Sequence, residues 1–168
     1  MTKGGLESTT LTSPIGKLYI LTRAETVLAL NLSGFKDLLS TLSEDELAEK
    51  IGKSSKNHPV VEKLERYFDG DLSAINSIKV KQPGGEFSQS AWASMRKIKA
   101  GTTESYSDLA YRAGSPAAVR AAGSACAKNK VALIIPCHRV VKTGGAIGAY
   151  GWGVDKKVWL LRHEGALD

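Results

Sequence analysis

The segment Gln82-Pro83-Gly84-Gly85 most limits how this chain can fold. Proline and consecutive glycines interrupt regular structure, and the hydrophobic pattern changes across them. Short apolar runs that alternate with polar residues precede the segment, whereas apolar residues recur at helical spacing after it. We therefore predict an α+β chain with two domains, residues 1–84 and residues 85–168.

The first domain is predicted to combine an antiparallel sheet with helices. Residues 9–22 alternate apolar and polar side chains around a Pro-Ile-Gly turn, and residues 27–32 continue this pattern after a second turn. Residues 35–51 and 58–68 have helical character. A last strand is predicted at residues 75–80.

The second domain is predicted to be mostly helical and to contain a winged helix-turn-helix. Ser115 is placed to cap the third of its helices, with Pro116 in the first turn. Gly144-Gly145 lies between two short apolar runs and favours a β-hairpin, or wing. The expected helices are residues 87–98, 105–112, 117–126 and 154–163.

Positive charge is concentrated in the second half of the chain. Residues 95–168 carry twelve Lys and Arg but five Asp and Glu, whereas residues 1–94 carry eleven and twelve. A one-sided basic field favours a polyanionic partner, and nucleic acid is the first candidate. Because basic isoelectric points are common in bacterial proteins, the charge alone leaves the partner open.

Cysteine and histidine are too few and too scattered for a metal site. The chain has two cysteines, Cys126 and Cys137, and three histidines, His58, His138 and His163, at no standard zinc spacing. It has no 18-residue apolar run and no apolar signal region at its N-terminus. We expect no metal, no cofactor, no membrane partner and no structural disulfide, in a protein of the cytoplasm, or of the nucleus in a eukaryote.

A cysteine and a histidine stand side by side in Pro136-Cys137-His138-Arg139, directly after the apolar run 131–135, which is expected to be buried. A thiolate is the nucleophilic form of cysteine, and nearby cations and an imidazole favour it. A free cysteine is equally often a buried core residue. Chemistry alone therefore leaves Cys137 open between a reactive and a structural role, whereas Cys126, among Ala and Gly, is interpreted as structural.

The predicted helix 117–126 is built almost entirely of Ala, Gly and Ser. Tight packing against another helix explains such a composition. Arg120 interrupts the run, however, and small side chains are poorly suited to reading base edges in a major groove. The alternative is close contact with a narrower groove, with Arg120 as the single long side chain.

Glu164 is predicted to lie at the C-terminal end of the last helix. Most such carboxylates are solvated, but an anion at this end opposes the helix dipole. A functional role explains its position, since a carboxylate can accept a hydrogen bond from His138 and hold the ring in one tautomer.

Eight segments of the second half resemble the O6-alkylguanine-DNA alkyltransferase family of DNA repair proteins. Residues 134–140, with Pro-Cys-His-Arg-Val after two isoleucines, are the most specific of them. Residues 124–129 and 150–153 look most like the C-terminal half of the bacterial adaptive-response protein Ada. The remaining matches are residues 87–92, 101–106, 118–123, 148–150 and 159–165.

The resemblance implies a ribonuclease H-like first domain and a monomer that acts on double-stranded DNA carrying O6-alkylguanine, with O4-alkylthymine as a second candidate substrate. Contact is expected in the minor groove, with the damaged nucleotide flipped out and Arg120 filling the gap. The alkyl group is expected to pass irreversibly to Cys137, once per protein molecule. The residues expected to contact DNA are Tyr106, Ser107, Ser115, Arg120, Ala121, Gly123 and Thr143.

The family pattern also implies the roles of the residues around the sulfur. His138 is expected to act through a water, with Glu164 behind it, while Asn129 braces the segment that carries Cys137. Tyr106 is expected to help rotate the backbone phosphate and to donate a proton to the departing guanine. The guanine pocket is expected to be walled by Val140, Tyr150, Gly151 and Trp152.

Two departures and two alternatives remain. The chain has Lys99-Ala100 where many relatives have Ile-Pro, and Trp152 where some have glycine. A module that binds lesions without repairing them is one alternative function, against which the intact Cys137 argues. A Cys-His acyl hydrolase is the other, and it would turn over repeatedly without a stable adduct.

Overall fold

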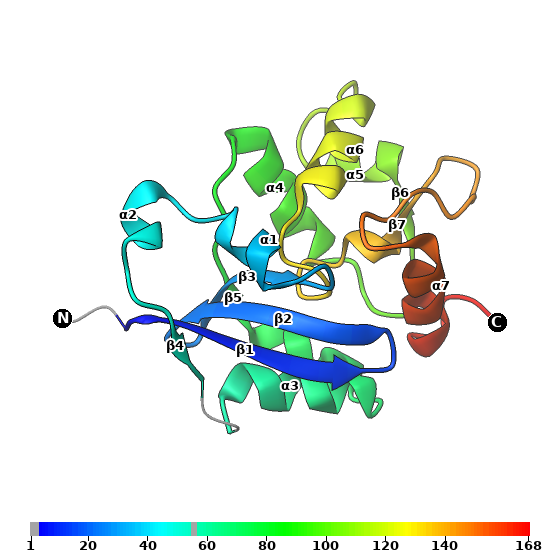
Figure 1. Ribbon diagram of the computed structural model, residues 1–168. Coiled ribbons are helices and arrows are strands. Elements are labelled where there is room, and N and C mark those ends of the chain that lie inside the picture. The colour runs from blue at the N-terminus through cyan, green and yellow to red at the C-terminus, as the bar shows by residue number, and fades with distance from the viewer. Residues whose placement is uncertain (1–3, 55–56) are drawn as a thin grey trace. The chain divides into compact units, whose positions relative to one another are not determined.

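The computed structural model describes residues 4–54 and 57–168, and it combines a mixed β-sheet with helices (Figure 1). The predicted α+β class is confirmed. The chain separates into two compact units, residues 1–82 and 83–168. This division falls two residues before the predicted one, so Pro83 and both glycines belong to the second unit.

The sheet of the first unit is built on an antiparallel meander. The strands β1 (Leu6–Ser13), β2 (Gly16–Arg23) and β3 (Thr26–Asn31) pair in sequence order, as predicted. Two short strands, β4 (Gly52–Lys53) and β5 (Lys79–Val80), pair in parallel with β1 and β3, which gives the order β4-β1-β2-β3-β5.

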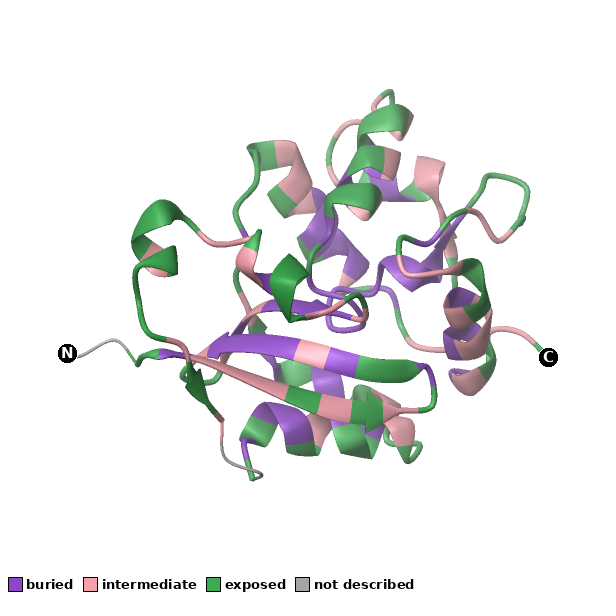
Figure 2. Ribbon diagram, in the orientation of Figure 1, coloured by how far each residue is buried: buried purple, intermediate pink, exposed green. Residues whose placement is uncertain are grey.

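Helices lie on both sides of this sheet (Figure 1). Helix α1 (Phe35–Leu39) places Leu38 against the cross-strand pair Leu21 and Ala29, and all three side chains are fully buried (Figure 2). Helix α3 (Pro59–Phe68) runs along the other side and buries an apolar stripe at helical spacing. That stripe consists of Val60, Val61, Leu64 and Tyr67.

Two predicted elements of the first unit are wrong. The single helix expected at residues 35–51 is instead α1 and a second short helix, α2 (Glu44–Leu47). Ser43 starts α2 through a capping box with Glu46, because such a pair satisfies two helix-end donors at once. The strand expected at 75–80 is mostly a 3₁₀ helix, η1 (Leu72–Ser77), and β5 contributes only its last two residues.

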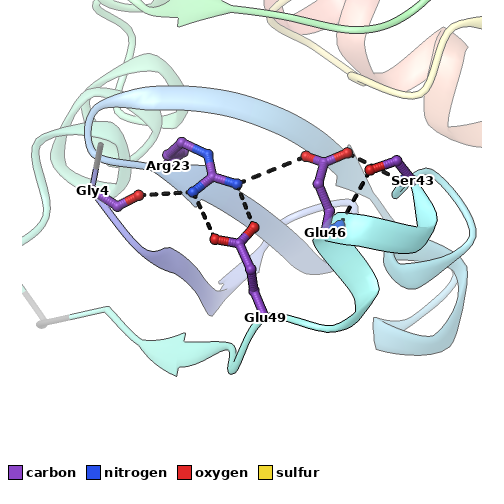
Figure 3. Close-up of polar contacts among 5 residues, drawn as sticks. All are labelled: Gly4, Arg23, Ser43, Glu46 and Glu49. Atoms are coloured by element: carbon purple, nitrogen blue, oxygen red, sulfur yellow. Dashed lines mark hydrogen bonds and ion pairs between the residues drawn. The ribbon is translucent and has the colours of Figure 1, made fainter. Parts of the chain in front are cut away.

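Arg23 links the end of β2 to the segment around α2 (Figure 3). Its guanidinium donates to both carboxylate oxygens of Glu49, at 3.1 and 2.6 Å, and to the Gly4 carbonyl at 2.9 Å. Glu46 Oε2 lies 3.9 Å from Arg23 Nη2. The hydrogen bond to Glu49 raises the pKa of Arg23, so this guanidinium stays charged.

The second unit carries four helices that close on a buried central segment (Figures 1 and 2). These are α4 (Glu86–Met95), α5 (Tyr106–Arg112), α6 (Val119–Lys128) and α7 (Val154–His163). The existence and order of all four are as predicted. None of the helices in the described ranges has the length and apolar character needed to cross a membrane.

The turn between α5 and α6 differs from the prediction at Ser115. Gly114 takes a positive φ of 95°, and the backbone N–H groups of Gly114 and Ser115 donate to the carbonyls of Tyr111 and Ala110. This is a glycine C-cap of α5. The predicted capping of α6 by Ser115 is therefore wrong, because Ser115 closes α5 through its backbone N–H. Helix α6 begins after Ala118 without a side-chain cap, and Pro116 lies before the helix.

The segment 131–141 is buried throughout, as expected for the apolar run 131–135, and its backbone is not extended (Figure 2). Leu133 has a φ of 68°, and tight backbone turns surround it, so the segment cannot extend. A single 3₁₀ turn, η2 (Cys137–Arg139), follows. Cys137 and His138 therefore lie in a turn and not on an extended chain, in which adjacent side chains point to opposite sides.

The predicted wing is a loop rather than a hairpin. Strand β7 (Val140–Val141) pairs in parallel with β6 (Glu104–Ser105) and not with residues after Gly145. The loop is closed by backbone bonds from Lys142 to Ala146 and from Gly145 to Lys142. Consecutive glycines at positive φ allow this tight closure.

Candidate active site

Cys137 begins the turn η2 and is almost completely buried, with 5% of its surface exposed. Its backbone N–H donates to the Ile135 carbonyl at 2.8 Å. Burial raises the pKa of the thiol, although a hydrogen bond from Asn129 and the charge of Lys157 both act to lower it. The resting group is therefore a protected thiol, and a thiolate forms only when a base removes the proton.

Asn129 holds the segment that carries the sulfur. It ends α6, and its Nδ2 lies 3.2 Å from the Val131 carbonyl, 3.0 Å from the Ile135 carbonyl and 3.4 Å from Cys137 Sγ. Its Oδ1 accepts from the Val131 N–H at 3.0 Å. One amide therefore joins the end of α6, the buried turns and the thiol.

His138 is fully buried beside Glu164. Its Nε2 lies 2.9 Å from Glu164 Oε2, while Nδ1 has no hydrogen-bond partner within the described part of the chain. Burial lowers the pKa of His138 despite the neighbouring carboxylate. In the neutral ring Nε2–H donates to Glu164, and Nδ1 is left as a proton acceptor.

Arg139 is the residue of this cluster to which sequence reasoning assigned no role. Its Nε and Nη2 donate to the two carboxylate oxygens of Glu164 at 2.9 and 2.8 Å, and Nη1 donates to the Ile98 carbonyl at 2.7 Å. A fork of this kind fits a carboxylate with two parallel bonds. The available signal was a cation two positions after the cysteine in an otherwise apolar run.

Glu164 follows the last turn of α7 and is buried. Burial alone would raise its pKa, but hydrogen bonds and charges from His138 and Arg139 together bring the pKa well below its usual range. Arg139 is charged at any ordinary pH, so it keeps the carboxylate ionised while His138 is neutral. This pairing also offsets the unfavourable helix-end position.

Tyr106 opens helix α5, which Ser105 and Asp108 cap reciprocally. Burial raises the pKa of its phenol. Its hydroxyl lies 3.3 Å from the point that a Cβ on Gly148 would occupy, and Gly148 has a positive φ of 79°. Glycine at 148 thus lets the loop backbone approach the phenol closely.

The predicted pocket wall comes from two backbone stretches. Val140 follows η2, and Tyr150 packs edge-on against Trp152 at 5.2 Å between ring centroids. Val140 and Tyr150 are buried, whereas Gly151 is exposed and Trp152 is intermediate. Lys157, a second residue without a predicted role, donates from Nζ to carbonyls of both stretches.

Helix α6 presents different residues to the interior and to solvent. Ala122 and Ala125 are buried, and Trp92 of α4 donates from its indole N–H to the Ala125 carbonyl at 2.9 Å. On this face the small side chains therefore allow tight packing against a neighbouring helix, which is one of the two interpretations drawn from the sequence. The exposed stripe contains Arg120, Ala121, Ser124, Ala127 and Lys128.

The other predicted DNA contacts are distributed around this helix. Ser107 and Thr143 share a hydroxyl hydrogen bond of 3.0 Å, which joins α5 to the loop after β7. Gly123 is partly buried on α6. Arg120 is exposed, and it makes no hydrogen bond or ion pair within the described residues.

The second unit matches a family of known proteins. Residues 86–166 match the model of the DNA-binding domain of 6-O-methylguanine DNA methyltransferase. A methylated-DNA–protein-cysteine methyltransferase of Salmonella typhimurium is 32% identical over 162 residues, which are 94% of this chain and 94% of that protein.

Two further relatives match part of the chain. A protein of the same description from Shigella flexneri is 41% identical over 106 residues, 63% of this chain and 62% of that protein's length. The bifunctional transcriptional activator and DNA repair enzyme Ada of Escherichia coli is 53% identical over 81 residues, 48% of this chain and 23% of Ada. The predicted resemblance to part of Ada is confirmed.

Among solved structures, OGT of Mycobacterium tuberculosis in complex with DNA has a TM-score of 0.79 at 29% identity. The match covers 95% of this chain and 93% of that one. The fold likeness therefore extends over both units and not only over the matched domain.

Proposed function

The chain belongs to the methylated-DNA–protein-cysteine methyltransferase family, and on this premise we propose that it restores O6-alkylguanine in double-stranded DNA by moving the alkyl group to Cys137. The observation that carries the proposal is the buried sulfur itself. Cys137 Sγ lies 3.4 Å from the Asn129 amide and directly precedes a histidine that is hydrogen-bonded to an ionised carboxylate.

The proposed reaction is an in-line displacement. The thiol proton passes through a water to His138 Nδ1, the one buried ring nitrogen without a partner in the described residues. Sγ then attacks the alkyl carbon, so a C–S bond forms while the C–O6 bond breaks and its electron pair stays on guanine. Tyr106 donates a proton to the departing base and regains one from solvent, while His138 releases the former thiol proton to solvent.

Glu164 and Arg139 support this proton transfer in the proposal. A neutral His138 that gains a proton becomes a buried cation, and the carboxylate 2.9 Å away stabilises it. Arg139 keeps that carboxylate ionised beforehand. A thioether is a poor leaving group and no second base lies beside the sulfur in the described residues, so each molecule reacts once.

The surface of α6 suits contact with DNA at close range. Arg120, Ala121 and Gly123 would approach the minor groove, with Arg120 filling the space of the flipped nucleotide. Ser107, Thr143 and the Ser115 turn would contact phosphates beside it. The supporting observation is the exposed stripe of small residues, which has a cation, Arg120 and Lys128, near each end.

The proposal includes O4-alkylthymine as a second possible substrate, a monomer, and a cytoplasmic location, or a nuclear one in a eukaryote. Gel filtration with and without DNA measures whether the protein is a monomer. Fractionation of cells measures its location. A parallel reaction with O4-methylthymine DNA tests the second base.

Intact-mass measurement tests the function directly. After incubation with O6-methylguanine duplex, the protein is expected to gain one methyl group, mapped to Cys137, and then to stop reacting. Cys137→Ser is expected to gain none, while Cys126→Ala, which removes the other thiol, gains the same mass as wild type. Binding without adduct would instead identify a lesion sensor, and repeated ester cleavage without adduct an acyl hydrolase.

A further inference from the structure

The last turn of α5 carries an exposed aromatic ring. Tyr111 is 72% exposed, more than any other large apolar side chain in the described part of the chain. A tyrosine combines an apolar ring with a polar hydroxyl, and such side chains are frequent where a protein meets a partner. One exposed side chain needs no explanation by itself, so the neighbours of Tyr111 decide what it can do.

Tyr111 shares one face of α5 with Ser107. Residues four positions apart are neighbours on a helix surface, so Tyr111 extends this face by one turn, or about 6 Å. Ser107 is hydrogen-bonded to Thr143, and the proposed function assigns both hydroxyl groups to DNA phosphates. The face of Tyr111 therefore continues the proposed DNA contact toward the end of the helix.

Arg112 follows Tyr111 and is held by a carboxylate that is mostly buried. Its Nη2 is paired with Glu104 Oε1, and the exposed fractions of the two side chains are 45% and 16%. Glu104 Oε2 is buried without a hydrogen-bond partner in the described residues. Because a buried carboxylate without its arginine is costly, Arg112 stays attached to Glu104. A guanidinium has five N–H donors, so the others can bind a second anion.

Backbone hydrogen bonds fix the helix end that carries these two side chains. The Gly114 N–H donates to the Tyr111 carbonyl at 3.1 Å, and the Ser115 N–H donates to the Ala110 carbonyl at 3.0 Å. A surface that is already rigid loses little conformational freedom when it binds a partner. Ser115, which the proposed function also assigns to phosphates, lies in the turn that follows directly.

The charge of this half of the chain favours an anionic partner. Residues 95–168 carry twelve Lys and Arg but five Asp and Glu. The acidic side chain within α5, Asp108, accepts a hydrogen bond from the Ser105 backbone N–H. Tyrosine hydroxyl groups and arginines are common phosphate ligands, and contacts of this kind do not read the base sequence.

We propose that Tyr111 and Arg112 bind the sugar–phosphate backbone of duplex DNA, next to the phosphates that Ser107 and Thr143 contact. Tyr111 donates its hydroxyl hydrogen to one phosphate, and Arg112 donates the N–H groups that Glu104 leaves free to a neighbouring one. Successive phosphates of one strand lie about 3.4 Å apart along the duplex axis, so one helical turn spans about two of them. The inference rests on the proposed function for the orientation of the DNA, but these contacts do not require a lesion.

Binding of an undamaged duplex at several salt concentrations tests the charge contact. In Arg112→Gln the slope of log K against log salt concentration is expected to become shallower by about 0.9, because one phosphate contact is lost. Arg66→Gln is the matched control, since Arg66 is 51% exposed and paired with Asp71 but belongs to the first unit. A slope in Arg112→Gln equal to that in Arg66→Gln overturns the proposal.

Tyr111→Phe tests the hydroxyl contact, and it also serves in case Arg112→Gln does not fold. The change removes one oxygen and no charge, so it leaves the long-range attraction to DNA as it was. Affinity for the undamaged duplex, measured by fluorescence anisotropy, is expected to fall roughly 2–10-fold. Tyr19→Phe, which removes a hydroxyl from the first unit, is expected to bind like wild type. Unchanged affinity in Tyr111→Phe overturns the proposal.

Neutral methylphosphonate groups, placed at one phosphate at a time, locate the contact. Cys137→Ser on an O6-methylguanine duplex keeps one binding register, because it does not react. At the phosphate that Tyr111 contacts, the loss from Tyr111→Phe and the loss from the methylphosphonate are expected to be smaller together than their sum. Additive losses at every position of both strands overturn the proposal.

Methyl transfer by the wild-type protein is measured in parallel with these experiments. If no methyl group reaches Cys137, the proposed function fails, while the affinities for the undamaged duplex still decide whether Tyr111 and Arg112 contact DNA.

Discussion

Glu164 serves two basic neighbours at once. Its Oε2 is shared by His138 and Arg139, and its Oε1 is bonded to Arg139. Removing this carboxylate therefore affects the imidazole that accepts a proton and leaves a buried guanidinium without its counter-charge. The residue is at the same time part of the proposed proton path and a condition for folding around Arg139.

Glu164→Gln is expected to lower both stability and reaction rate. The amide cannot neutralise Arg139, and an unpaired buried charge costs roughly 3–5 kcal/mol. The single-turnover rate of methyl transfer is expected to fall roughly 10²-fold, because His138 loses its anionic partner. Denaturant unfolding and quenched-reaction kinetics measure the two effects.

Asp155→Asn is the matched control for that variant. It removes a carboxylate from the same helix, but one that is 80% exposed. A change within about 0.5 kcal/mol is expected for such a surface residue. If both variants behaved alike, the burial and the bonds of Glu164 would have no special effect.

Acidification is expected to destabilise the second unit in two stages. The pKa of His138 is lowered by burial, and that of Glu164 lies below its usual range through its partners. For both, the unfolded chain takes up the proton first, so stability is complete above the unfolded pKa and falls below it. Loss therefore begins below about pH 6.5 and steepens below about pH 4.3.

Denaturant midpoints between pH 7.5 and pH 3 measure this dependence. His138→Gln is expected to flatten the upper stage and leave the lower one. A midpoint in the wild type that stays constant down to pH 3 would contradict the buried neutral imidazole and the paired carboxylate.

At the level of single residues, the sequence allowed Cys137, His138 and Glu164 to be chosen, because the Pro-Cys-His-Arg motif is specific and the position of Glu164 is electrostatically unusual. The partners of Glu164 were harder to foresee. From the sequence alone Arg139 looks like a surface cation, and Lys157 follows another lysine directly in a predicted helix. Their burial depends on how distant segments fold together.

The indole ring of Trp92 links helices α4 and α6. Trp92 donates to the Ala125 carbonyl, and its other edge lies against Gly84. A Cβ on Gly84 would lie 2.6 Å from this ring, nearer than side-chain atoms normally approach. The glycine that marks the boundary in the sequence is therefore also a packing requirement.

Gly84→Ala is expected to destabilise the protein by roughly 1–3 kcal/mol, because Trp92 must shift and lengthen its bond to α6. Gly85→Ala is the control, since nothing lies within 4 Å of its added Cβ. Urea unfolding compares the two. Equal stability of both variants would show that the ring moves without cost.

Arg120→Ala is expected to slow repair of duplex DNA far more than reaction with the free base analogue benzylguanine. Only the duplex requires the nucleotide to be flipped and the gap to be filled. Arg162→Ala removes an equal charge from an exposed position of α7 and is expected to affect neither reaction strongly. Equal losses on both substrates in Arg120→Ala would refute the gap-filling role.

The elements with strong periodicity were predicted well. The β1–β3 meander and α7 follow the alternation and the helical spacing of their apolar residues. Residues 35–51 were misjudged because Ser43 starts a new helix through a local hydrogen-bond pair, and hydrophobic spacing does not detect such a pair. The backbone turns within the apolar run at 131–135 were not predicted, because buried turns and buried strands have similar compositions.

The two units differ in charge as well as in structure. Basic residues outnumber acidic ones only in the second half of the sequence, which also carries α6 and Cys137. Attraction to phosphates is thus expected to come from this unit, while the acidic α2 region and the Arg23 cluster lie in the first unit. The division in chemistry coincides with the division in fold.

DNA binding by Cys137→Ser, which cannot react, is expected to weaken about tenfold or more between 50 and 200 mM salt, because each phosphate contact releases counterions. The reaction of wild-type protein with uncharged benzylguanine is expected to change little over the same range. Fluorescence anisotropy and single-turnover kinetics measure these two quantities. Binding that is independent of salt would remove the basic surface from the proposal.

The depth at which Cys137 lies has a consequence for the cell. A molecule that can work only once is wasted if a stray oxidant or electrophile reaches it first. Cys137 is buried behind the Asn129 amide and stays protonated until the alkylated base is bound. Each molecule is therefore protected from side reactions before it meets damaged DNA. The number of intact copies, rather than a turnover rate, then sets how much damage a cell can tolerate.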